Sequence, residues 1–102
     1  MSNNLSYATE FLGTFFFLGV ILMATGGGAS KAALGNVAPL AIGVALVAVI
    51  CFGGGISGGH FNPAVSVMMY FNKALPMNDL LAYVGAQVAG GMAALKFAQL
   101  AR

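Results

Sequence analysis

Three long apolar runs dominate the distribution of hydrophobic and polar residues along the chain. They cover residues 7–26, 37–55 and 80–98. Each is close to the length of about 20 helical residues that a hydrocarbon core of about 30 Å requires. Pro39 suits the first turn of the second run, because a proline there loses no helical hydrogen bond. The pattern therefore predicts an all-α transmembrane protein whose three spanning helices form a single domain, residues 1–102.

A fourth segment, residues 56–72, breaks this pattern. The glycines between residues 53 and 59 are too dense for a helix interior, so we expect extended backbone there. At membrane depth such backbone must be buried in protein or line a water-filled cavity. Residues 62–72 then suit a helix, with Asn62 as N-cap and Pro63 at the first helical position. At about 1.5 Å per residue this helix is roughly 16 Å long, so a re-entrant loop and a half-helix are predicted.

The last predicted span carries a face of small residues. Asn78 or Asp79 is expected to cap this helix just after Pro76. Small side chains then recur at spacings of three and four, which lets a neighbouring helix approach closely. They are Ala82, Ala86, Ala89, Gly90, Ala93 and Ala94.

Composition supports a membrane environment and excludes several functions. Hydrophobic residues make up 60% of the chain and charged residues 6%, against about 25% charged in soluble domains. The charges are scattered, with no basic cluster for nucleic acid. Cys51 is the only cysteine, so no disulfide or thiolate metal site is expected. No nucleophile and base pair or carboxylate cluster is present, so we expect neither an enzyme nor a cofactor.

A half-helix that ends at the membrane midplane has a chemical consequence. Its first N–H groups lack helical partners and carry positive partial charge, which suits the oxygen of a passing solute. Asn62 adds side-chain donors there, and the carbonyls of residues 58–61 are expected to be free acceptors. Together they would replace the hydrogen bonds that a water or alcohol loses on leaving bulk solvent. For an isolated Asn-Pro, a helix break used only for packing is the alternative.

The sequence around this break carries a family resemblance. Residues 57–66, Ser-Gly-Gly-His-Phe-Asn-Pro-Ala-Val-Ser, resemble the first Asn-Pro-Ala box of the aquaporin and aquaglyceroporin (major intrinsic protein) family. Residues 8–15 and 83–91 resemble the first and third spans of that family, in the same order. The resemblance implies a set of pore and box residues: Gly58, Gly59, His60, Phe61, Asn62, Pro63 and Ala64.

The chain departs from the family in having one box. Family members have six spans and two boxes in inverted halves, so the resemblance implies half of an aquaporin-like fold that an inverted second copy completes. The family places an arginine after its second box, whereas Val65 follows Ala64 here. The resemblance also implies four candidates for the selectivity filter, when the family's filter positions are carried over by their distance from the box: Ile42, Ile50, Gly59 and Val65. Such an aliphatic filter is expected to separate water from glycerol poorly.

Three further polar residues are candidates for a supporting role. Glu10 is a lone acid in a span, which is costly unless it is paired. The resemblance implies that its carboxylate accepts hydrogen bonds from a box loop, and Gln87 is expected to bond the same region. The alternative places Glu10 near the headgroups, at the start of its helix. His60 has no companion ligands, so we expect it to contribute its carbonyl rather than to bind a metal or relay protons.

The predicted function is a passive channel for water and small neutral solutes such as glycerol, in a multi-pass protein of the cell membrane. We expect inverted pairs in a homo-oligomer with up to four pores. Lys73 and the N-terminal amine are expected on one side of the membrane, and Lys31, Lys96 and Arg102 on the other. The positive-inside rule then gives only a weak preference, so both orientations in one membrane are expected. One alternative is a non-conducting structural or regulatory subunit beside full-length aquaporins. Another is a truncated or engineered half. The initial Met1 and the absence of a tag weigh weakly against this second alternative.

Overall fold

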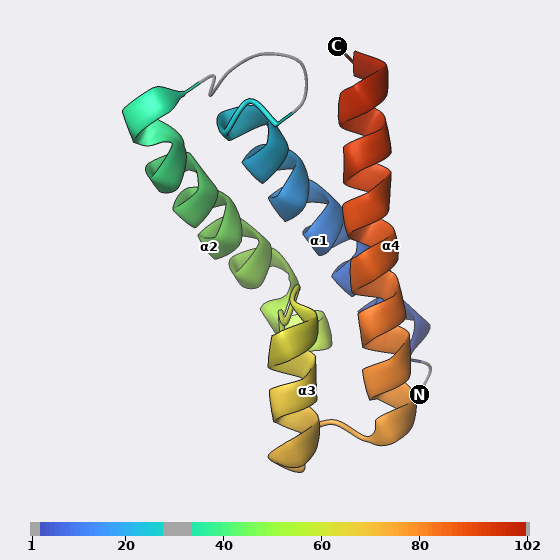
Figure 1. Cartoon of the computed structure of the whole chain (residues 1–102). Helices are drawn as coiled ribbons and strands as arrows, with labels where there is room; N and C mark the ends of the chain where they lie inside the picture. Colours follow the sequence, from blue (N-terminus) through green and yellow to red (C-terminus); the bar gives the residue numbers. More distant parts are fainter. Residues whose placement is uncertain (1–2, 28–33, 102) are drawn as a thin grey trace.

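The computed structural model describes residues 3–27 and 34–101 as helices joined by short turns (Figure 1). In order they are α1 (Asn4–Ala24), η1 (Gly35–Val37), α2 (Ala38–Ser57), α3 (Pro63–Phe71) and α4 (Met77–Ala101), η1 being a short 3-10 helix. Three helices are long and apolar enough to cross a membrane, namely α1, η1 with α2, and α4. The three predicted spans are thereby confirmed. Lys31 and Arg102 lie outside the described residues.

The helix ends differ from the predicted ones by a few residues. The span predicted at 7–26 begins and ends earlier as α1, and the span predicted at 80–98 is longer at both ends as α4. Asn78 and Asp79 therefore lie inside the first turn of α4, and the prediction that one of them caps it is wrong. Asp79 instead accepts hydrogen bonds from Asn3 and Tyr7, which ties the start of α4 to the start of α1.

The extended backbone predicted for the glycine-rich segment is shorter than expected. Residues 53–57 continue α2, so the prediction of extended structure there is wrong. The reason lies in packing: a Cβ atom on Gly53 would lie 2.7 Å from Thr9 Cγ2 of α1. A glycine at this position lets two helices approach closely without breaking either. The chain leaves the helix only at Gly58, whose φ of 93° is left-handed.

The half-helix begins where the sequence predicts. Asn62 is the N-cap of α3, its side-chain oxygen accepts from the Ala64 N–H, and Pro63 is the first helical residue. The predicted length of 62–72 is slightly too long, because α3 ends at Phe71 and Lys73 turns into a left-handed conformation with φ of 62°.

Helix α1 is the centre of the arrangement and packs against both α2 and α4. The crossing of α1 and α4 brings the two backbones together, since a Cβ on Gly90 would lie 2.5 Å from the Phe11 carbonyl oxygen. Of the predicted small-residue face, Gly90 and Ala94 are buried, and the other members are partly or fully exposed. Figure 1 shows α3 beside the lower half of α4 only, whereas the upper halves of α2 and α4 stand apart.

Polar side chains, rather than large apolar ones, fill the most buried positions. The largest fully buried side chains are those of Gln87, Glu10, Thr14 and Ser66. Many large apolar side chains point outward; Phe52, for example, is 70% exposed, whereas Phe61 and Leu80 are among the few that are buried. A protein in water would be destabilised by this distribution, whereas lipid tails or a second protein surface would cover it favourably.

Candidate functional site

The candidate site is built around the loop of residues 58–62, which joins α2 to α3. Positive φ angles at Gly58, Gly59 and Phe61 turn the chain sharply between the two helices. Within the described part of the chain, no hydrogen bond reaches the carbonyl oxygens of residues 58–61. These carbonyls are therefore available as acceptors.

Glu10 holds this loop from α1. Its side chain is fully buried, with 0% exposed. Oε2 accepts from the His60 N–H at 3.0 Å and from Ser57 Oγ at 2.6 Å, and Oε1 accepts from the Phe61 N–H at 2.7 Å. The carboxylate lies inside the protein and against the loop, so it is paired within the protein and not exposed at its surface. Every contact brings a donor to a carboxylate oxygen, which offsets the cost of burying the acid.

Gln87 reaches the same group from α4. Its Nε2 donates to Glu10 Oε1 and to Ser66 Oγ, both at 2.9 Å. It therefore bonds the carboxylate that holds the loop and the half-helix that follows the loop. Ser66 Oγ also lies 2.8 Å from His60 Nδ1, so a continuous set of hydrogen bonds links α1, α3, α4 and the loop. This network fixes where the half-helix begins.

The network includes residues that the sequence analysis missed. Ser57 donates to Glu10, Ser66 joins Gln87 to His60, and Tyr83 Oη donates to the Ser57 carbonyl at 2.6 Å. One signal was available in the sequence: Tyr83 lies one helical turn before Gln87 and therefore shares its face. The two serines carry no such signal.

Asn62 lies at the exposed start of α3. Its Oδ1 accepts from the Ala64 N–H at 2.8 Å, so the amide group Nδ2 is turned away from the helix. Asn62 and Pro63 line a cavity of about 590 Å³ at the N-terminus of α3. The rest of its wall comes from the loop and from α1 and α4: Phe61, Thr14, Phe17, Leu18, Ile21, Leu22, Gln87, Val88, Gly91, Met92 and Leu95.

Comparison with known proteins identifies the family. The family model for major intrinsic proteins (MIP) matches residues 3–101. The chain belongs to the major intrinsic protein family. Together with three helices of membrane-spanning length, this makes it a multi-pass integral membrane protein.

Curated relatives of the chain are longer members of this family. Glycerol uptake facilitator protein-like 6 of Lactiplantibacillus plantarum is 41% identical over 90 residues, 86% of this chain and 39% of that protein. Aquaporin Z of Brucella melitensis is 39% identical over 104 residues, 92% of this chain and 42% of that protein. An aquaglyceroporin of Toxoplasma gondii is 42% identical over 78 residues, 76% of this chain and 30% of that protein. The chain thus spans less than half the length of these relatives. No solved structure gave a significant match.

The four filter candidates of this major intrinsic protein fall into two groups. Ile50 and Gly59 are neighbours, since a Cβ on Gly59 would lie 3.6 Å from Ile50 Cα. Ile42 lies about 12 Å from Ile50 toward the N-terminus of α2, at ~1.5 Å per residue. Val65 is in the first turn of α3 and is partly buried. Ile42 is thus separated along α2 from the candidates next to the loop.

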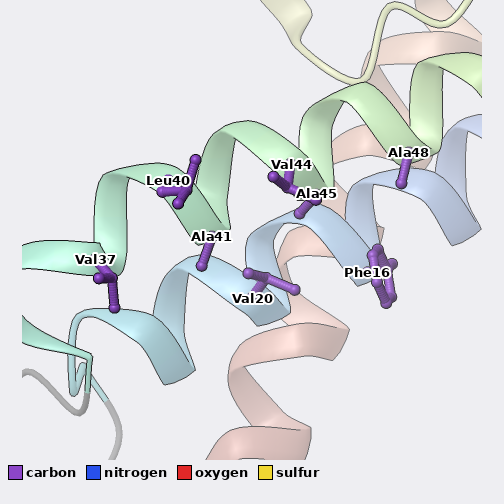
Figure 2. Close-up of a pocket in the computed structure, with 8 residues that line it drawn as sticks. All are labelled: Phe16, Val20, Val37, Leu40, Ala41, Val44, Ala45 and Ala48. Carbon is purple, nitrogen blue, oxygen red and sulfur yellow. The ribbon is translucent and has the colours of Figure 1, made fainter.

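A second hollow lies away from the loop, between α1 and α2. Figure 2 shows its lining, which consists of apolar side chains. It measures about 480 Å³ and is lined by Phe16, Val20, Val37, Leu40, Ala41, Val44, Ala45 and Ala48. Without polar groups this groove can bind lipid or another apolar surface but cannot compensate the lost hydration of a polar solute.

The described residues offer no metal site, because no group of three or more His, Cys, Asp or Glu side chains comes together among them. His60 is held instead by its N–H to Glu10, by Ser66, and by edge-to-face packing on Tyr83 with ring centroids 5.1 Å apart.

Proposed function

We propose that the chain forms a passive channel for water and small neutral solutes such as glycerol, with each channel built from two copies in opposite orientation. The family and the names of the relatives, an aquaporin and a glycerol uptake facilitator-like protein among them, support this solute class. The proposal includes no chemical step and no cofactor.

The observation that carries the proposal is the orientation of the Asn62 side chain. Because its oxygen caps the half-helix, its two N–H donors face outward at the point where α3 begins. Pro63 has no N–H and the Ala64 N–H is bonded to Asn62, so within the described residues only the Val65 N–H of the first turn is left without a partner. This N–H and the positive end of the helix dipole add to the same place. A neutral oxygen-bearing solute is favoured there, and a cation is repelled.

The free carbonyls of residues 58–61 complement these donors. Water and glycerol hydroxyl groups both donate and accept hydrogen bonds, so a row of acceptors ending at donors can replace their hydration step by step. Anions are disfavoured along such a row of carbonyl oxygens.

The need for a second copy follows from the length of α3. Its nine residues span about 14 Å at ~1.5 Å per residue, less than half of the ~30 Å hydrocarbon core. The cavity beyond its N-terminus lies between α1 and α4. The half-helix of an inverted copy can occupy this space. The Asn62 side chains of the two copies would then lie next to each other.

Liposomes that contain only this purified chain provide the test. We expect water permeability above that of empty liposomes, with the weak temperature dependence typical of a pore, and glycerol uptake as well. A tandem fusion of two inverted copies should conduct at least as well per chain. If neither preparation conducts although both are incorporated into the liposomes, the channel is ruled out. The alternative of a non-conducting subunit is then favoured.

A further inference from the structure

The side chain of Phe61 occupies a notch between α1 and α2, formed by Gly13 and Gly53, and Thr9 lies beside Gly53. Phe61 is only 3% exposed. A Cβ on Gly13 would lie 2.1 Å from Phe61 Cε1, and a Cβ on Gly53 would lie 2.9 Å from Phe61 Cζ. Both distances are far below contact distance, so the ring fills the notch because these two positions lack side chains.

The backbone of Phe61 is in a conformation that needs such support. Its φ of 52° is left-handed, which a residue with a large side chain rarely adopts unless its surroundings hold it. The Phe61 N–H donates to Glu10 Oε1 at 2.7 Å, and the ring is held in the notch. The residue is therefore held both through its backbone and through its side chain.

In the described part of the chain, hydrogen bonds hold the loop through its N–H groups and not through its carbonyls. The two bonds from Glu10 to the loop backbone hold the N–H groups of His60 and Phe61, which lie next to each other. The Gly59 N–H also donates to Ser57 Oγ, at 3.2 Å. No hydrogen bond within the described residues reaches the carbonyls of residues 58–61 themselves. The buried ring adds a packing contact with α1 and α2 that restrains the peptide planes carrying these carbonyls.

We propose that Phe61 is a positioning residue whose ring, seated in the notch, fixes the direction of the free carbonyls and thereby the width of the polar path. This inference rests on the proposed function, since it assumes that a solute passes these carbonyls. It concerns the side chain of Phe61, whereas the sequence analysis assigned a role only to its carbonyl.

The experiment measures two quantities on the purified chain: hydrogen exchange of the His60 and Phe61 amides in lipid nanodiscs, and the ratio of glycerol to water flux in liposomes. Phe61→Leu, which removes the outer ring atoms, should speed exchange roughly tenfold and raise the flux ratio. Gly13→Ala should do the same by displacing the ring. Gly19→Ala is the matched control in α1, because its Cβ would meet nothing closer than 4.0 Å.

Combined variants separate this role from a general loss of packing. The double variant Gly13→Ala with Phe61→Leu should change the amide exchange rates of the loop by less than the two single variants added together. The reason is that the added methyl group occupies space left by the ring. Gly53→Ala should not be relieved by Phe61→Leu alone, since Thr9 Cγ2 would remain 2.7 Å away. Adding Thr9→Ser, which removes that methyl group, should relieve it.

Each outcome decides the inference. Unchanged amide exchange in Phe61→Leu and Phe61→Ala, or equal effects of Gly13→Ala and Gly19→Ala, overturns it. If the wild type conducts nothing, the proposed function fails, and the exchange data alone show whether the ring positions the loop. If a Gly13 variant does not fold, the Phe61 variants decide.

Discussion

Gln87 of α4 donates a hydrogen bond to Glu10 of α1 over 2.9 Å, although 77 positions separate them in the sequence. This bond closes a buried network whose other members hold the 58–62 loop and the start of the half-helix. The stability of the fold and the geometry of the candidate site therefore depend on one carboxylate.

Replacing that carboxylate should be strongly destabilising. In Glu10→Gln one oxygen becomes an NH₂ group, so at least one backbone N–H, that of His60 or of Phe61, loses its acceptor inside the protein. We expect a loss of about 2–5 kcal/mol in unfolding free energy. Thermal unfolding in detergent provides the measurement. Asp79→Asn, the same change at a partly exposed acid with two hydrogen bonds, is the comparison and should cost less. Equal melting temperatures for Glu10→Gln and the wild type would show that the network contributes little.

Asn62→Asp should abolish most neutral-solute flux, because it replaces donors with an acceptor and puts charge where desolvation is costly. A fall of roughly tenfold or more in water permeability is expected. Asn72→Asp is the matched control: Asn72 is the exposed C-cap at the other end of α3. If both variants incorporate equally and conduct like the wild type in stopped-flow measurements, Asn62 does not line the conducting path.

The sequence predicted elements that depend on local signals. Apolar runs of about 20 residues located the three spans, and the Asn62-Pro63 pair located the start of the half-helix, since capping and proline preference act within one turn. The family resemblance added the contact between Glu10 and the loop. These features depend on composition over a short window or on a motif.

Other features depend on contacts between distant residues and could not be predicted. The same glycine content suits an extended loop or a closely packed helix, and only the position of Thr9 on α1 shows that Gly53 belongs to the second kind. In the same way, the apolar character of Phe61 gives no indication that its ring lies between two glycines from different helices.

Both orientations of the chain should occur in one membrane. The described charges are few, with Lys73 and Asp79 near one end of the spans and Lys96 toward the other, so the positive-inside rule gives little preference. An inverted pair also requires both orientations. A C-terminal tag fused to reporters active on opposite sides of the membrane should give signal from both. Signal from one side alone would contradict a channel made of identical copies.

The last prediction concerns solute discrimination. In the proposed pair, each mouth combines Ile42 of one copy with Ile50, Gly59 and Val65 of the other. Within one chain, Ile50 and Gly59 are already adjacent, while Ile42 lies about 12 Å away along α2 at ~1.5 Å per residue, as this division requires. Aliphatic groups exclude solutes by size but cannot orient them by hydrogen bonds, so glycerol should pass together with water.

Val65→Arg adds to such a mouth the kind of charged donor that the second box of the family supplies. A guanidinium group narrows the opening and offers directed donors that a single water satisfies more easily than a longer alcohol. We expect glycerol flux to fall more than water flux, by roughly tenfold in the ratio. Val67→Arg, on the exposed side of the same half-helix, is the control for added charge. A wild type that already rejects glycerol, together with a Val65→Arg variant whose flux ratio does not change, would show that this position is not part of the filter.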